Sequence, residues 1–174
     1  MALAKDYQSV MARSNEIQKE ALGLDYKDFE TSPIAFDYDA LMKSTGYTLE
    51  EIEKIQSLHG VGNTPLLELR NITKLARKYA KPGYGARIFV KDESCNASGS
   101  FKDRRAACAV AHAKKLGYKG VMAATSGNYG AAVASQAAMQ GLNCIIVLEC
   151  YDSKGVGQPE IVEKARKCEA LGAE

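Results

Sequence analysis

The chain carries the octapeptide Ser98-Gly99-Ser100-Phe101-Lys102-Asp103-Arg104-Arg105 between two regular runs. A strand-like run from Ala86 to Lys91 precedes it, and an alanine-rich helical run from Arg105 to Leu116 follows it. Lys102 is therefore predicted to lie where a turn opens a helix, beside free backbone N–H groups and the positive end of the helix dipole. This position disfavours a charged ammonium group, and a lysine that loses its proton can form a Schiff base with an aldehyde.

Strands and helices alternate through the second part of the chain, which predicts a parallel α/β sheet with right-handed crossovers. The later two strands are near-continuous apolar runs, as expected when helices cover both faces of a sheet. We therefore predict a three-layer αβα parallel sheet. Its expected units are strand 87–91 with the helix after residue 102, strand 120–125 with helix 129–140, and strand 143–149 with helix 159–171.

The first part of the chain, residues 1–59, is predicted to be a helical N-terminal segment, and residues 60–174 the αβα unit. Apolar residues from Leu3 to Ile17 fall near helix spacing, and a loop is expected from residue 25 to 37. Thr48 and Glu51 have the spacing of a capping box ahead of an apolar stripe at residues 49–58. That stripe is interpreted as core, although it could contact a second subunit.

Composition and charge exclude several classes of protein. The 174 residues are 46% hydrophobic and 25% charged, which is typical of a folded domain. Net charge is −5 over residues 1–60 and +7 over residues 61–174, so the second part is suited to an anion such as a phosphate or carboxylate. The basic residues are too dispersed to indicate nucleic-acid binding. No apolar run is long enough to span a membrane and residues 1–19 lack a signal-peptide core, so a cytoplasmic location is expected.

The five cysteines are odd in number and include no Cys-x-x-Cys pair. This spacing predicts reduced thiols rather than a disulfide framework, and it indicates no metal site.

Two loops are expected at the carboxyl ends of the strands, where open parallel sheets bind ligands. We call residues 93–102 the lysine loop and residues 125–130 the asparagine loop. The asparagine loop reads Thr125-Ser126-Gly127-Asn128-Tyr129-Gly130 and opens a helix. Its hydroxyls, amide and backbone N–H groups are suited to an anion, although it is not a Walker loop.

These loops resemble a known family. The run from Lys91 to Arg104 resembles the cofactor-lysine motif of fold type II pyridoxal-phosphate enzymes, with Ala97-Ser98 in place of the usual Pro-Thr. The family includes threonine synthase, the tryptophan synthase β chain and serine dehydratase. Its upstream signature resembles Gly62-Asn63-Thr64-Pro65-Leu66, and a further landmark resembles residues 171–174. The resemblance covers about residues 58–174, with four motifs in order.

The resemblance implies a role for each loop. Lys102 would be the catalytic residue and would bind pyridoxal 5'-phosphate as a Schiff base, and Asn128 would hydrogen-bond the phenolic oxygen of the cofactor. Thr125, Ser126, Gly127 and Asn128 would bind the carboxylate of an amino-acid substrate. The cofactor would act as an electron sink, and Lys102, once released, could move protons at Cα or Cβ.

Within the family, the whole sequence, residues 1–59 included, resembles the larger subunit of coenzyme A-dependent thiolases that act in amino-acid breakdown. This implies coenzyme A, a small second subunit and homo-oligomerisation. The alternatives are a threonine synthase-like replacement or elimination enzyme, and a non-catalytic binding or assembly module.

The chain also departs from the family pattern. The family's glycine-rich phosphate loop and the Ser or Thr beside the pyridine nitrogen, both expected downstream, have no counterpart in these residues. Gly155 and Gly157 lie in a connection and are not assigned to the phosphate. We therefore expect these 174 residues to form the first lobe of the fold only, and to bind the cofactor weakly by themselves.

Other chemically active residues have simpler interpretations. Cys95 lies in the lysine loop and could carry an acyl group, but a partly buried structural thiol is expected. His59 and His112 are interpreted as structural. Asp103 and Arg104 are expected to make local ion pairs or to start the helix.

Overall fold

The computed structural model describes residues 6–174. They belong to two compact units, one ending at residue 49 and one running from residue 50 to 174. The first residues of the expected N-terminal helix, Leu3 among them, lie outside the described residues. The division into residues 1–59 and 60–174 stays a prediction.

Short elements with acidic caps make up the first unit. Asp6, Asp25 and Asp37 each accept a hydrogen bond from a backbone N–H in the first turn of the helix that follows. The segment expected to be a loop contains a 3-10 turn and a small antiparallel hairpin in which Phe36 packs against neighbouring aromatic rings. The elements are α1 (Tyr7–Ala12), α2 (Ser14–Leu22), η1 (Tyr26–Phe29), β1 (Glu30–Ser32), β2 (Ala35–Phe36) and α3 (Tyr38–Ser44).

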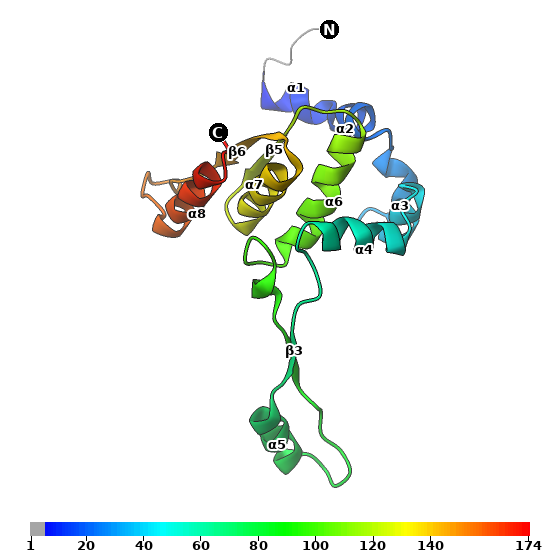
Figure 1. Cartoon of the computed structure of the whole chain (residues 1–174). Helices are drawn as coiled ribbons and strands as arrows, with labels where there is room; N and C mark the ends of the chain where they lie inside the picture. The colour runs from blue at the N-terminus through cyan, green and yellow to red at the C-terminus, as the bar shows by residue number, and fades with distance from the viewer. Residues whose placement is uncertain (1–5) are drawn as a thin grey trace. The chain divides into compact units, whose positions relative to one another are not determined.

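The second unit contains the predicted strand–helix alternation (Figure 1). Its elements are α4 (Leu49–Leu58), β3 (Leu66–Glu68), α5 (Arg70–Tyr79), β4 (Phe89–Lys91), η2 (Glu93–Cys95), α6 (Lys102–Lys115), β5 (Gly120–Thr125), α7 (Asn128–Gln140), β6 (Asn143–Leu148) and α8 (Pro159–Ala170).

Strands β5 and β6 pair in parallel, from Gly120 opposite Asn143 to Thr125 opposite Leu148. Helix α7 crosses over between them and packs on both strands, with α6 and α8 on either side of it. Every residue from Gly130 to Ala137 is buried, because small side chains, mostly alanine, allow strands and helices to approach closely. The core therefore lies around α7.

The predicted three-layer sheet is wrong in two respects. Strand β4 pairs antiparallel with β3, as Leu66 opposite Lys91, and does not join β5. The described residues also place helices on one face of β5 and β6 only, and α6, α7 and α8 share a single core there. Met122 is 72% exposed and Ile145 47% exposed on the other face.

Both errors have the same origin. An apolar run such as 120–125 indicates a strand that can be buried on both faces. It does not indicate that helices from residues 6–174 cover both of those faces. Likewise, the backbone N–H and C=O groups of a three-residue strand such as β4 can form hydrogen bonds with any strand that lies beside it. Here that neighbour is β3, joined to it through α5.

None of the helices formed by residues 6–174 combines the length and the apolar character that a membrane span requires.

Candidate functional site

Lys102 is the first residue of α6, as its sequence position predicted. Its backbone N–H donates to the hydroxyl of Ser100 at 3.2 Å, and its ammonium nitrogen lies 4.4 Å from the centre of the Phe101 ring. Among residues 6–174, this ammonium group has neither a carboxylate partner nor a hydrogen-bond acceptor. No ion pair therefore competes for this lysine, whose neutral amine form is the nucleophile.

The rest of the lysine loop is held by a glycine turn, the buried side chain of Asp103 and a lysine from α8. Gly99 adopts φ +81°, which allows its N–H to donate to the Asn96 carbonyl at 2.8 Å and closes a tight turn. Asp103, fully buried, accepts the backbone N–H of Ser98 at 2.6 Å. The ammonium group of Lys167, from α8, donates to the Ser98 carbonyl at 2.6 Å. The backbone N–H and the backbone carbonyl of Ser98 are therefore both held in place.

Glu93 forms the second set of contacts. Its carboxylate accepts two hydrogen bonds from Arg104, at 2.6 and 2.8 Å, and one from the hydroxyl of Thr64 at 2.7 Å. The Arg104 guanidinium, together with the Thr64 and Asn96 hydrogen bonds, lowers the pKa of the Glu93 carboxyl to about 2. The expected local ion pair of Arg104 is confirmed. Asp103 lies in the first turn of α6, which starts at Lys102, and makes no ion pair within residues 6–174.

The asparagine loop has few internal contacts. The Thr125 hydroxyl accepts the backbone N–H of Gly127 at 3.0 Å, and no side chain caps α7, which starts at Asn128. Within the described part of the chain, the exposed Ser126 and Asn128 side chains make no hydrogen bond. These groups and the first N–H groups of α7 are therefore available to an anion.

Gly130 sets where this loop lies. A Cβ atom on Gly130 would lie 2.4 Å from Cγ2 of Thr125 and 2.9 Å from Cγ2 of Ile146. The missing side chain lets the first turn of α7 pack directly against the ends of β5 and β6. The loop is therefore positioned by close packing.

The two loops are brought together by their helices. Arg105, in the first turn of α6, stacks over the ring of Tyr129, in the first turn of α7, with 4.7 Å between guanidinium carbon and ring centre. From α8, Lys167 reaches the lysine loop, and Lys164 lies 3.9 Å from the position of a Cβ on Gly127. The ammonium group of Lys102 at the start of α6, and the amide and N–H groups at the start of α7, are therefore carried by two helix starts that contact each other.

The remaining candidates lie elsewhere or are structural. His59 bonds the Ile55 carbonyl at 2.7 Å, and His112 lies within α6. The expectation that Cys95 is partly buried is wrong: it is exposed, because the η2 turn lies outside the packed helices. All five cysteines are free thiols. Within residues 6–174, no three His, Cys, Asp or Glu side chains are grouped so as to hold a metal ion.

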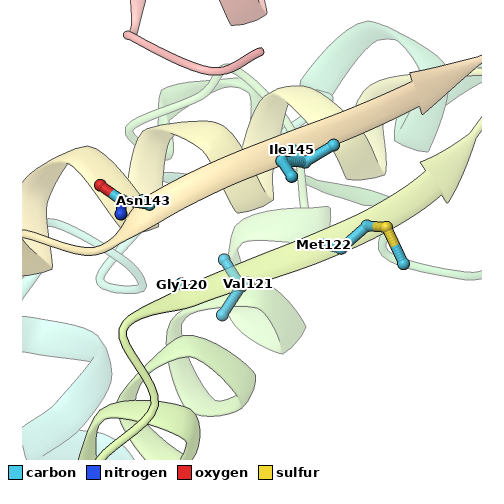
Figure 2. Close-up of a pocket in the computed structure, with 5 residues that line it drawn as sticks. All are labelled: Gly120, Val121, Met122, Asn143 and Ile145. Atoms are coloured by element: carbon cyan, nitrogen blue, oxygen red, sulfur yellow. The ribbon is translucent and has the colours of Figure 1, made fainter.

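A shallow pocket exists at the opposite end of β5 and β6 (Figure 2). It is lined by Gly120, Val121, Met122, Asn143 and Ile145, which lie at or near the first residues of these strands. Its lining includes no nucleophilic or charged side chain. The lysine loop and the asparagine loop lie away from it, and the asparagine loop follows the carboxyl end of β5.

The sequence interpretation missed part of the site. Glu93, Asn96, Thr64 and Lys167 were given no role, although Glu93 and Asn96 stand in the motif of residues 91–104 and Thr64 in the upstream signature of residues 62–66. Lys167 gives no local signal, since it lies 69 positions from the residue that it contacts.

Comparison with known proteins identifies the family. Residues 58–174 match the model of the family described as pyridoxal-phosphate dependent enzyme, and the chain belongs to this family. The cofactor of the family is pyridoxal phosphate. A cysteine synthase from Entamoeba histolytica is similar in structure, with a TM-score of 0.54 at 30% identity over 83% of this chain and 37% of that one.

Two relatives match over 99% of the chain. Both are described as 2-amino-4-ketopentanoate thiolase beta subunit; one, from Acetoanaerobium sticklandii, is 74% identical, and one from an unknown prokaryotic organism is 67% identical. The chain spans 37% of the length of each. A threonine synthase from Halalkalibacterium halodurans is 43% identical over 51% of this chain and 23% of that protein.

The residues present fit one end of the family's cofactor. An aldehyde requires a free amine, and within residues 6–174 the side-chain nitrogen of Lys102 has neither an ion pair nor a hydrogen bond, only the Phe101 ring contact. A phenolic oxygen or a carboxylate requires donors, and among the described residues the Asn128 amide and Ser126 hydroxyl of the asparagine loop are unused, while the Gly127 N–H is bonded to Thr125. The phosphate end has no corresponding glycine-rich loop in this sequence.

Proposed function

We propose that the chain is the lysine-bearing part of a 2-amino-4-ketopentanoate thiolase β subunit. The substrate would be 2-amino-4-ketopentanoate, which is also called 2-amino-4-oxopentanoate. The reaction would cleave it with coenzyme A to give acetyl-CoA and alanine. The bond that breaks joins Cβ to the keto carbon; the acetyl group passes to the thiol sulfur, and Cβ gains a proton. The observation that carries this proposal is the 74% identity over 99% of the chain, N-terminal unit included.

Each loop has a role in this proposal. When bound, pyridoxal phosphate supplies an electron sink that stabilises negative charge at Cα. Lys102 binds the cofactor aldehyde and, when free, moves a proton at Cα or Cβ. The asparagine loop orients the substrate: Thr125, Ser126 and Gly127 bind its carboxylate, while Asn128 contacts both carboxylate and cofactor.

Coenzyme A, a small second subunit and self-association of the β subunit are part of the same proposal. The word "subunit" in the names of both relatives supports a partner chain. A cytoplasmic location would suit an enzyme whose thiol substrate is coenzyme A.

The decisive experiment supplies 2-amino-4-oxopentanoate and coenzyme A to the full-length protein together with its small partner subunit. Formation of acetyl-CoA and alanine in equal amounts is expected, and Lys102→Ala is expected to abolish it. No acetyl-CoA from the folded complex would reject the thiolase assignment.

A threonine synthase-like reaction is the second candidate, supported by the 43% identity over 89 residues to a threonine synthase. Formation of threonine by the full-length protein, with no need for coenzyme A, would favour it.

A further inference from the structure

One carboxylate joins three separate segments of the second unit. Glu93 follows β4, and its partners are Thr64 in the turn before β3, Asn96 within the lysine loop and Arg104 in the first turn of α6. Arg104 stands two residues after Lys102. The geometry points to Glu93, acting with Arg104, as a positioning residue that fixes the lysine loop so that Lys102 is aimed at the cofactor aldehyde. This inference rests on the proposed function of Lys102.

The pair of Glu93 and Arg104 has the geometry of the strong class of ion pair. Nε and Nη2 of Arg104 donate to the two different carboxylate oxygens, at 2.6 and 2.8 Å. Such a fork fixes both the direction and the distance of the two groups. An isolated exposed pair, such as Lys43 with Asp39, makes a single contact and fixes neither.

Glu93 has no capacity left for proton transfer. Besides the two Arg104 bonds, its oxygens accept from the Thr64 hydroxyl at 2.7 Å and from the Asn96 amide at 3.0 Å. An ionised carboxylate offers about four acceptor positions, so these four bonds fill it. With a pKa lowered to about 2 by Arg104 and Thr64, the carboxyl stays ionised at neutral pH. It acts through its neighbours and not on the substrate.

The contacts of Glu93 lead directly to the loop. Asn96, buried, uses its amide oxygen to accept the backbone N–H of Gly62 at 2.9 Å, while its amide nitrogen donates to Glu93. Lys91, at the end of β4, donates to the Thr64 carbonyl. One end of the lysine loop is therefore anchored to the Gly62–Thr64 turn, and the Glu93 carboxylate contacts one residue on each side of this junction, Asn96 and Thr64.

The other end of the loop is fixed independently, by Asp103 and Lys167 at Ser98. Loss of the Glu93 carboxylate contacts would therefore leave the start of α6 folded but loosen residues 94–97, where Asn96 would keep its bonds to the Gly62 N–H and the Glu93 carbonyl. Lys102 would keep its place in the helix and lose a defined approach to the aldehyde. This separation allows positioning to be measured apart from folding.

The test uses Glu93→Gln in the full-length protein, with pyridoxal 5'-phosphate as the probe. Borohydride reduction at timed intervals followed by peptide mass spectrometry gives the modification rate of each lysine. We expect the limiting rate at Lys102 to fall about tenfold, since misplacement of a reacting group costs rate steeply. Its half-saturation concentration should change less, and exposed lysines such as Lys119 should react as before.

Glu68→Gln is the matched control. Glu68 contacts Arg87 through one bond of 3.2 Å between β3 and the segment before β4, so the same chemical change is made away from Lys102. The Lys102 rate should not change in this variant. All rates are measured at a temperature below the thermal unfolding midpoints of the variants, where each variant is folded. If Glu93 contributed only to the stability of the fold, the limiting rate at Lys102 would then be the same as in the wild type.

Thr64→Val serves if Glu93→Gln does not fold. It removes one donor to Glu93 and leaves the Arg104 fork in place, so a reduction of about two- to threefold is expected. A wild-type Lys102 rate in folded Glu93→Gln, or in Thr64→Val where it replaces that variant, overturns the inference.

Failure of the proposed function gives a different result. If Lys102 of the wild-type protein is not modified in preference to other lysines, both the lysine assignment and the role of Glu93 are rejected. If Lys102 is modified selectively but no acetyl-CoA forms, only the thiolase reaction is rejected.

Discussion

The lysine loop and the asparagine loop both lead into a helix, yet they use their polar side chains in opposite ways. In the lysine loop, Asn96 is buried and its amide group is fully engaged with Gly62 and Glu93. In the asparagine loop, Asn128 is exposed and unbonded among the described residues. One loop is fixed by hydrogen bonds; the other is fixed by packing and leaves the side chains of Ser126 and Asn128 unbonded within residues 6–174.

This difference matches two chemical tasks. In the proposed function Lys102 is a covalent attachment point, which requires a defined direction, and the loop before Lys102 is ordered by its own side chains. A reversible ligand requires donors that are not already satisfied within the protein, since a donor with a partner gains little from a ligand. The largest expected effects therefore come from changes that disturb what fixes each loop.

Gly130→Ala tests whether packing holds the asparagine loop. The new Cβ would lie 2.4 Å from Cγ2 of Thr125 and 2.9 Å from Cγ2 of Ile146, both on stiff β-branched side chains. We expect a loss of about 1–3 kcal/mol in the free energy of unfolding, measured with urea. Gly127→Ala is the control, because its Cβ would meet only the flexible end of Lys164, at 3.9 Å. Equal stability of both variants would show that packing does not position this loop.

Two alanine substitutions compare the loops directly. Asn96→Ala leaves the Gly62 N–H without its acceptor and should lower the free energy of unfolding by about 1–3 kcal/mol. Asn128→Ala removes an exposed side chain and should change it by less than about 0.5 kcal/mol, while cofactor binding weakens. Urea unfolding and the cofactor absorption spectrum give the two readouts. A large stability loss for Asn128→Ala would contradict the proposed division of roles.

Acid should weaken the lysine loop before the asparagine loop. Glu93 has a folded pKa of about 2, lowered by Arg104 and Thr64 from the ordinary 4.5, so its stabilising contribution is complete above pH 4.5 and is lost as pH falls toward 2. The urea midpoint of the wild type should therefore fall more between pH 5 and 3 than that of Glu93→Gln, a small difference that needs parallel titrations. Identical pH slopes would show that Glu93 does not contribute to this acid sensitivity.

Much of this site could be predicted from local sequence. The helix starting at Lys102, the strand ending at Thr125 and the loop opening α7 all follow from short patterns of glycine, apolar and small residues. Such patterns act through neighbours a few positions apart along the chain, so they are visible in the sequence. The order of the motifs also identified the family that the comparisons then showed.

The pairing of strands and the polar contacts could not be predicted in the same way. The antiparallel pairing of β4 with β3, and the open face of β5 and β6, depend on how segments meet in space. The Lys167 contact with Ser98 and the Glu93 contact with Thr64 join positions 69 and 29 residues apart. Nothing in the local pattern of either partner specifies the other.

By itself, the sequence determined that Lys102 stands at a helix start and that the asparagine loop offers free donors, because turn and helix propensities are local properties. Only the tertiary structure decided that these two helix starts lie together, through Arg105 and Tyr129. It also decided that the side chains of Glu93 and Asp103 fix the lysine loop. The physical reason is that packing of the alanine-rich α7 against α6 sets which distant polar groups can meet, and buried polar groups then require partners.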